Sequence, residues 1–204
     1  MTDIASRIAA RALADRGAAY ESEVRRLIDA GIEVMRRCGT ESRPRVADIV
    51  AAAGLSNEAF YRHFPSKDAL VAAILEDGAE RLGSYLAHQM GKESTPEGRI
   101  RRWVEGVLSQ ATDDDIAATT LAVMWNGGSL SQGITSGPPT ASGPLAPLLR
   151  APFAALGSVD PDLDASLAAH ATIGKLNDYL WHRTRPSDAE IAHIVEFCLA
   201  IVRR

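Results

Sequence analysis

The chain has 204 residues, of which 46% are hydrophobic and 24% are charged, and its formal net charge is −4. This composition supports a folded core and excludes an intrinsically disordered chain. The two cysteines, Cys38 and Cys198, lack CxxC or CxxH spacing, so no metal site is expected, and they predict reduced thiols in a cytoplasmic protein. Charged residues interrupt the N-terminus, and no apolar stretch is long enough for a signal peptide or a membrane span.

The charge is distributed unevenly along the chain. Residues 1–67 carry 11 Lys or Arg against 9 Asp or Glu, whereas the remaining residues carry 11 against 17. An overall acidic chain argues against nucleic acid as a partner. The basic N-terminal third, however, has the sign of charge that a DNA-binding segment requires.

Apolar residues recur at three- and four-residue spacing along most of the chain, which predicts an all-α fold of about nine or ten helices. Helices are expected at 4–13, 20–37, 45–52, 57–63 and 66–90, and further helices are expected to begin near Pro96, Asp113, residue 145, Asp160 and Ser187. Residues 127–144 are rich in Gly, Ser and Pro, which predicts a long loop.

The segment from Arg45 to Leu70 has the pattern of a helix, a tight glycine turn and a short second helix. Gly54 suits the turn, Ser56 suits the N-cap, and Leu55 and Phe60 have the spacing of a hydrophobic staple. The second helix should display polar side chains that can read bases in a major groove, with neighbouring residues on phosphates. The expected DNA-binding residues are Arg45, Ser56, Asn57, Glu58, Tyr61, Arg62, His63 and Lys67.

This segment resembles the TetR family of bacterial regulators. The resemblance rests on Ile49, the Ala53-Gly54 turn, the Tyr61-Arg62-His63-Phe64 run and Ser66-Lys67, and it covers roughly residues 20–75. One departure is Pro44-Arg45, which stands where the family commonly has Thr or Ser before the first helix of the motif. The resemblance implies a DNA-binding helix-turn-helix domain at 1–65, with an N-terminal extension, and an effector-binding and dimerisation domain at 66–204.

The N-terminal extension has two interpretations. Arg7 and Arg11 lie four residues apart, on one face of a helix, and as an arm they would reach the DNA that flanks the recognised site. The alternative is an ordinary solvated helix face.

Several aromatic and polar residues of the larger domain are candidates for lining an apolar effector cavity. For each of them taken singly, ordinary core packing is the alternative. The candidates are Trp103, Val107, Met124, Trp125, Phe153, Asn177 and Trp181.

The last two helices have long apolar faces, and in the TetR family such helices pair across a two-fold axis. The alternative is that they pack only within one chain. The expected dimer-interface residues are Leu167, Ala171, Leu176, Ile191, Val195 and Leu199.

The predicted function is a transcriptional repressor that binds palindromic double-stranded DNA as a homodimer and is released by a small hydrophobic or aromatic effector. The alternative is a DNA-binding factor that responds to a protein partner and has no small-molecule effector. An enzyme is not expected, because the GxSxG, Walker A, GxGxxG and HExxH motifs are all missing, and no cofactor is expected.

Overall fold

The computed structural model describes residues 3–127 and 143–202, and this part of the chain is helical without a strand. None of its helices is long and apolar enough to cross a membrane. The all-α prediction is confirmed, and the predicted loop at 127–144 lies, apart from its ends, outside the described residues. In chain order the elements are α1 (Ile4–Cys38), α2 (Val46–Ala53), α3 (Asn57–His63), α4 (Lys67–Met90), α5 (Pro96–Leu108), the 3₁₀ helix η1 (Ser109–Ala111), α6 (Asp114–Gly127), α7 (Pro147–Ala155), α8 (Pro161–His182) and α9 (Asp188–Ala200).

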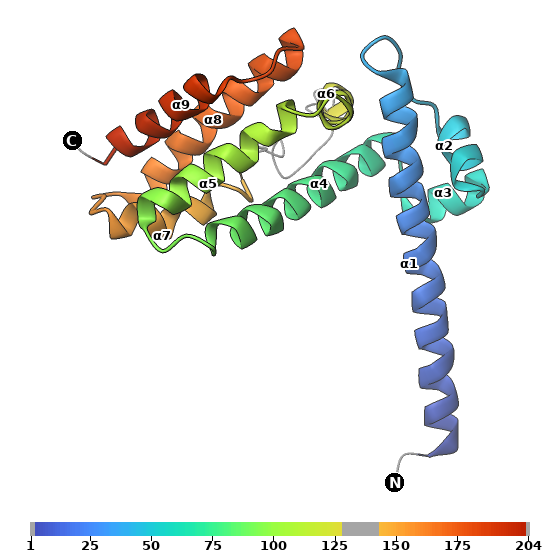
Figure 1. Cartoon of the computed structure of the whole chain (residues 1–204). Helices are drawn as coiled ribbons and strands as arrows, with labels where there is room; N and C mark the ends of the chain where they lie inside the picture. The colour runs from blue at the N-terminus through green and yellow to red at the C-terminus, as the bar shows by residue number, and fades with distance from the viewer. Residues whose placement is uncertain (1–2, 128–142, 203–204) are drawn as a thin grey trace.

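Helix α1 corrects the expectation of two N-terminal helices, because it runs unbroken for 35 residues. The segment that joins the two expected helices, residues 14–19, contains three alanines and no proline. Alanine has the highest helix propensity, and the single Gly17 weakens a helix by only about 1 kcal/mol, so nothing in the segment ends the helix. Every residue from 3 to 22 is exposed, and α1 projects far beyond the rest of the molecule (Figure 1).

The first of two hydrophobic cores lies where α1, α2, α3 and the start of α4 meet. Figure 1 shows α2 and α3 together on one side of α1. Leu27 of α1 and Phe60 of α3 are completely buried in this core. The core therefore fixes α3 to the middle of α1 and to the first turns of α4. Its other large buried members include Met35, Ile49, Leu70 and Ile74.

The second core joins the far half of α4 to α5, α7, α8 and α9. Trp103 of α5 is completely buried there, and its indole Nε1 donates a hydrogen bond to the carbonyl oxygen of Leu145 at 3.1 Å. Helix α4 contributes Leu70 to the first core and Leu86 to the second, so one continuous helix spans both. Helix α6 packs against α1, α4 and α8, and it forms the other connection between the two cores.

Several predicted helix starts are confirmed in detail. Ser66 accepts a hydrogen bond from the backbone N–H of Ala69, and Thr95 accepts one from Gly98, each at 3.1 Å. Ser187 and Glu190 form the expected capping box at the start of α9. These contacts satisfy N–H groups that have no partner inside a helix.

Candidate nucleic-acid interface

The turn between α2 and α3 has the geometry that the sequence predicts. Gly54 has φ 62° and ψ 39°, a left-handed conformation that glycine adopts without strain. The side chain of Ser56 accepts a hydrogen bond from the backbone N–H of Ala59 at 3.1 Å, which caps α3. The turn and the cap together set the direction in which α3 leaves α2.

Arg26 of α1 fastens this turn, although the sequence gives no sign of that role. Its guanidinium donates from Nε to the carbonyl oxygen of Ala53 at 3.0 Å and from Nη2 to that of Gly54 at 2.9 Å. Both acceptors lie at the end of α2, where carbonyl groups lack helical partners. Arg26 stands on the polar side of an amphipathic helix, so hydrophobic periodicity could not distinguish it from a solvated charge.

The outer side of α3 is open to solvent. Tyr61 has 58% of its surface exposed, and Asn57 and Glu58 are exposed beside it. Arg45, before α2, is exposed, and Lys67, at the start of α4, is half-buried. Within the described part of the chain, the side-chain polar groups of Arg45, Asn57, Tyr61 and Lys67 form no hydrogen bond or ion pair, so they are available to an external partner.

His63 is placed differently from the prediction that it points outward. Its side chain is 0% exposed, and its Nε2 lies 2.6 Å from Oε2 of Glu23. The ring of Tyr20 packs edge-on against the imidazole, with 4.2 Å between the ring centroids. The unbroken α1 carries Tyr20 and Glu23 across the end of α3. The imidazole of His63 is therefore covered and cannot contact a base, which corrects the prediction.

Glu23 binds two neighbouring residues of α3 at once. Besides His63, it accepts a hydrogen bond from Nη2 of Arg62 at 2.6 Å. The hydrogen bonds from His63 and then Arg62 lower the pKa of Glu23 below its ordinary value, so the carboxylate is charged at neutral pH. Since a carboxylate only accepts hydrogen bonds, Nε2 of His63 carries the proton, and its buried Nδ1 has no partner. We call the contact of Glu23 with Arg62 and His63 the α1–α3 clasp.

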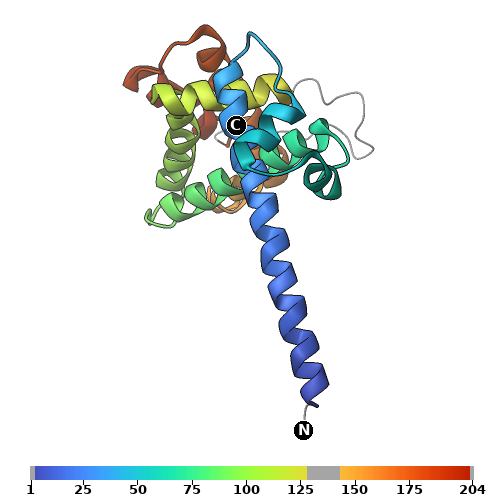
Figure 2. The same ribbon diagram turned by 90° about the vertical axis from the view of Figure 1, so that its right-hand side faces the viewer.

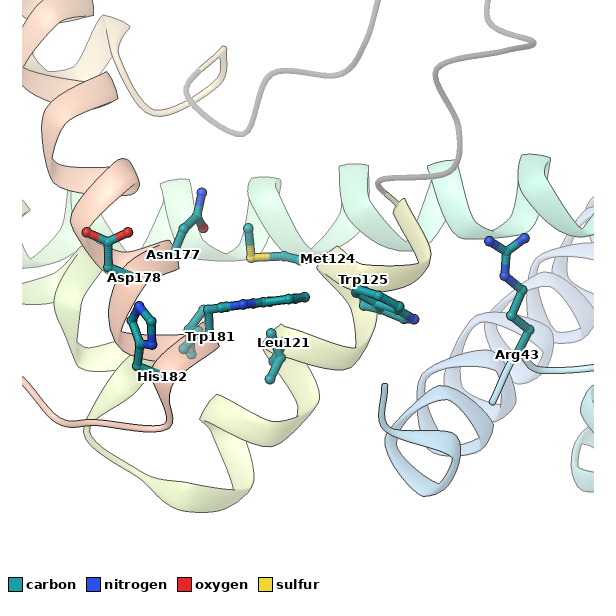
Figure 3. A pocket seen from close by; sticks show the side chains of 9 residues that line it. Arg43, Leu121, Met124, Trp125, Asn177, Asp178, Trp181 and His182 are labelled. Atoms are coloured by element: carbon teal, nitrogen blue, oxygen red, sulfur yellow. The ribbon is translucent and has the colours of Figure 1, made fainter. Parts of the chain in front are cut away.

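The candidate effector residues divide into two groups. Trp103, Val107 and Phe153 are completely buried in the second core, which corrects the expectation that they line a cavity. Met124, Trp125, Asn177 and Trp181 do line a cavity of about 540 Å³, between α6 and α8. The rings of Trp125 and Trp181 lie 5.4 Å apart between centroids with an interplanar angle of 31°. Figure 3 shows them beside Met124, while Arg43 approaches from the loop before α2.

A second cavity, of about 310 Å³, adjoins the first, since both are lined by Leu121 and Leu180. It is also lined by Arg36 and Gly39, at the end of α1. Both cavities therefore lie where the helix-turn-helix part of the chain meets α6 and α8. The sequence gives no sign that Arg36 or Arg43 lines a cavity, because the meeting of these elements is a feature of the tertiary fold alone.

The candidate dimer residues also divide. Leu176, Val195 and Leu199 belong to the second core, so they present little surface to another chain, which corrects the expectation for these three. Leu167 is 53% exposed, whereas Ala171 and Ile191 are half-buried. Large apolar side chains that the prediction missed are more exposed than most of the predicted set: Leu163, Trp181 and Phe197.

The α1–α3 clasp should contribute to stability in a pH-dependent way. The folded-state pKa of Glu23 lies below its unfolded-state value, so the contribution is complete above the ordinary glutamate range and is lost as pH falls through the folded-state pKa. We expect Glu23→Gln to lower the free energy of unfolding in urea at neutral pH, and the difference from the wild type to shrink at an acidic pH below the ordinary glutamate range.

Glu21→Gln is the matched control for this prediction, because Glu21 is an exposed residue of the same helix. It should leave the free energy of unfolding unchanged at both pH values. An equal loss of stability in both variants would contradict a specific contribution from the clasp.

Comparison with known proteins agrees with this geometry. Residues 27–74 match the sequence model described as bacterial regulatory proteins, tetR family. No curated protein matches the chain. Among solved structures, a putative transcriptional regulator from Pseudomonas aeruginosa shares 20% identity over 88% of each chain, with a TM-score of 0.67. A putative TetR-family regulator from Mesorhizobium loti shares 18% identity over 89% of this chain and 97% of its own, with a TM-score of 0.65.

A third similar structure is that of RolR in complex with the ligand resorcinol. It shares 19% identity over 92% of this chain and 89% of its own, with a TM-score of 0.59. At these identities the structures establish a common fold, while the match at 27–74 covers the helix-turn-helix and its supporting helices. Residues 27–74 thus match the tetR family of bacterial regulatory proteins, and the described part of the chain shares the fold of the TetR-family structures that it resembles.

Proposed function

We propose that this chain is a repressor that binds a palindromic operator as a homodimer and releases it when a small aromatic effector binds. Residues 1–65 would form the DNA-binding domain, and residues 66–204 the effector-binding and dimerisation domain. The observation that carries the proposal is the outer face of α3, where the side chains of Asn57, Glu58 and Tyr61 are exposed and have no polar partner among the described residues, on a helix that is firmly fixed from behind.

In this proposal α3 enters the major groove. Asn57 and Glu58 face the base edges, since amide and carboxylate groups discriminate bases by hydrogen bonding. The hydroxyl of Tyr61 binds a backbone phosphate. The Ser56 oxygen accepts the cap hydrogen bond, which leaves its hydroxyl hydrogen free to donate to a phosphate. Arg45 and Lys67 supply positive charge at the edges of the groove, whereas the charge of Arg62 is balanced by Glu23.

Asn57→Ala and Lys67→Gln should affect DNA binding in different ways. Loss of a base contact should weaken operator binding by about 1–3 kcal/mol and leave binding to random DNA nearly unchanged. Loss of a phosphate contact should weaken binding to both sequences and reduce the salt slope by about 1 per contact. Fluorescence anisotropy with the intergenic DNA next to the gene measures both effects. If the wild type binds no such fragment at low salt, the repressor proposal fails.

The surface that would bind a second copy follows α8. Leu163 and Leu167, one helical turn apart, are each 53% exposed, and Phe197 of the neighbouring α9 is 51% exposed. Exposed apolar side chains at helical spacing are typical of a surface that is covered in an assembly. A symmetric pair of chains would also place the two copies of α3 on successive major grooves, about 34–36 Å apart.

Leu167→Glu should therefore shift the protein toward monomers, because a carboxylate would be buried at a two-fold contact. We expect a rise of about tenfold or more in the dimer dissociation constant, which corresponds to about 1.4 kcal/mol. Sedimentation velocity measures the change. Ile116→Glu is the control, because Ile116 is an exposed apolar residue of α6. A wild type that sediments as a monomer would contradict the dimer.

The effector site would be the cavity beside Trp125 and Trp181. Indole rings stack on planar aromatic compounds, the Asn177 amide can bind a polar substituent, and Met124 adapts to shape. The ligand of RolR, resorcinol, is an example of such chemistry in a protein of the same fold. Because Arg43 lines the same cavity, a bound compound would contact both domains and could favour one separation of the paired heads over another.

This site is tested with resorcinol, benzoate and related aromatic compounds. A compound that binds should quench tryptophan fluorescence and raise the free energy of unfolding by about 2.7 kcal/mol at 100 times its Kd. Trp181→Leu should abolish both effects, whereas Phe197→Leu, at an exposed aromatic residue outside the cavity, should not. If no compound binds, a DNA-binding factor that responds to a protein partner becomes the better account.

A further inference from the structure

The part of α1 before Tyr20, residues 4–19, is called here the N-terminal arm. It measures about 24 Å at 1.5 Å per residue. All of its residues are exposed, and Figures 1 and 2 show it projecting away from the rest of the molecule in both views. None of its side chains forms a hydrogen bond or ion pair among the residues that the structure describes. The arm therefore contributes nothing visible to the packing of its own chain.

Most of the stability of a protein helix comes from tertiary packing, which the arm lacks. The alanines of the arm favour a helix, but Gly17 weakens it near the point where it leaves the first core. An external partner would supply the stabilisation that the chain itself does not provide.

The C-terminal end of the arm lies beside the end of α3. Tyr20 packs on His63, and Glu23 binds Arg62 and His63, so α1 crosses α3 just after the arm ends. In Figure 1 the arm continues beyond α3 on the N-terminal side of this crossing. A duplex seated on the exposed face of α3 extends well past α3 itself, and its backbone would run beside the arm.

The residues of the arm suit DNA better than a protein groove. At 100° per residue, Ile4 and Ile8 lie about 40° apart around the helix, whereas Leu13 lies about 180° from Ile4. All three are more than 60% exposed, and they make no single apolar face for a partner helix. Arg7, Arg11 and Arg16 outnumber Asp3 and Asp15, and none of these arginines is paired.

We propose that the N-terminal arm is a second DNA-binding element, which lies as a helix along the backbone that flanks the groove occupied by α3. Arg7 and Arg11, one turn apart on the same face of the helix, bind phosphate oxygens there. These contacts are independent of base sequence, so the arm adds affinity and position while α3 provides specificity. The inference rests on the proposed function, since it requires that α3 binds DNA.

The test compares full-length proteins on a random-sequence duplex of about four helical turns, over about 50–300 mM NaCl. The Arg7→Gln/Arg11→Gln variant should bind about tenfold more weakly at low salt, and its salt slope should fall by about 2 per protomer. Arg99→Gln/Arg101→Gln removes the same charge from exposed positions of α5 and should retain the wild-type slope.

The outcomes separate this inference from the repressor proposal. If the wild type does not bind the duplex, both fail. If the wild type binds and the arm variant matches the α5 control in affinity and slope, the arm does not contact DNA and the function of α3 stands. If the arm variant changes the sedimentation coefficient instead, the arm binds a second copy of the chain, and the inference is overturned.

Gly17→Ala tests whether the arm binds as a helix. A Cβ at Gly17 meets no atom within 4 Å, so alanine fits and only the helix propensity changes. Binding to the same duplex should tighten by about 2- to 5-fold, because less order must be gained on DNA. Gly78→Ala, at another glycine of an exposed helix face with open space, should leave DNA binding unchanged. Weaker binding by Gly17→Ala would contradict a helical arm.

Discussion

The contact of α1 with α3 is the constraint on which the proposed DNA recognition by this molecule depends. Helix α3 has seven residues, too few to hold a helical shape or a fixed direction alone. Its inner side is held by the buried Phe60, its start by the Ser56 cap, and its end by the α1–α3 clasp. Base recognition needs side chains placed within about 0.5 Å, and this support comes from residues that never touch a base.

The two cores are joined in a way that suits regulation. Helix α4 spans both, and α6 packs against α1 on one side and α8 on the other. The cavities lie beside α6, at the same junction, rather than inside the second core, where Trp103 and Phe153 fill the space completely. A compound that enters this junction acts where the domains meet, so a coupling energy of only about 1–3 kcal/mol would suffice for a useful response.

Local signals in the sequence were enough to predict the helix-turn-helix. Gly54, Ser56 and Pro65 specify the turn, the cap and the end of α3 by their own chemistry, and the structure confirms each boundary within one residue. The family model then recognises the same segment. The gap in the apolar pattern at residues 14–19 predicts two helices, but the structure has one. Alanine maintains a helix without packing, so a gap in the apolar pattern need not be a gap in the helix.

The remaining errors concern which partner covers a given face. Periodicity shows that Val195 and Leu199 face an apolar surface, but it does not show whether that surface belongs to the same chain. His63 looked like a solvated polar residue because its cover, Tyr20 and Glu23, comes from about forty residues earlier in the sequence. Met124, Trp125, Asn177 and Trp181 line one cavity because side chains on α6 and α8 face the same space, which the order of residues alone does not reveal.

Because α1 is unbroken, a tilt of this helix about its contact with α3 would move its two ends in opposite directions. Its C-terminal end borders the second cavity through Arg36 and Gly39, its middle rests on α3, and its N-terminal end is free. From Glu23 the rod extends about 22 Å toward the cavity and about 28 Å toward its tip, at 1.5 Å per residue. A displacement of about 2 Å at the cavity would therefore swing the tip by about 2–3 Å in the opposite direction. Once the arm is held as a helix on DNA, α1 would thus carry a displacement at the cavity to the far side of the proposed DNA-binding surface with slight amplification.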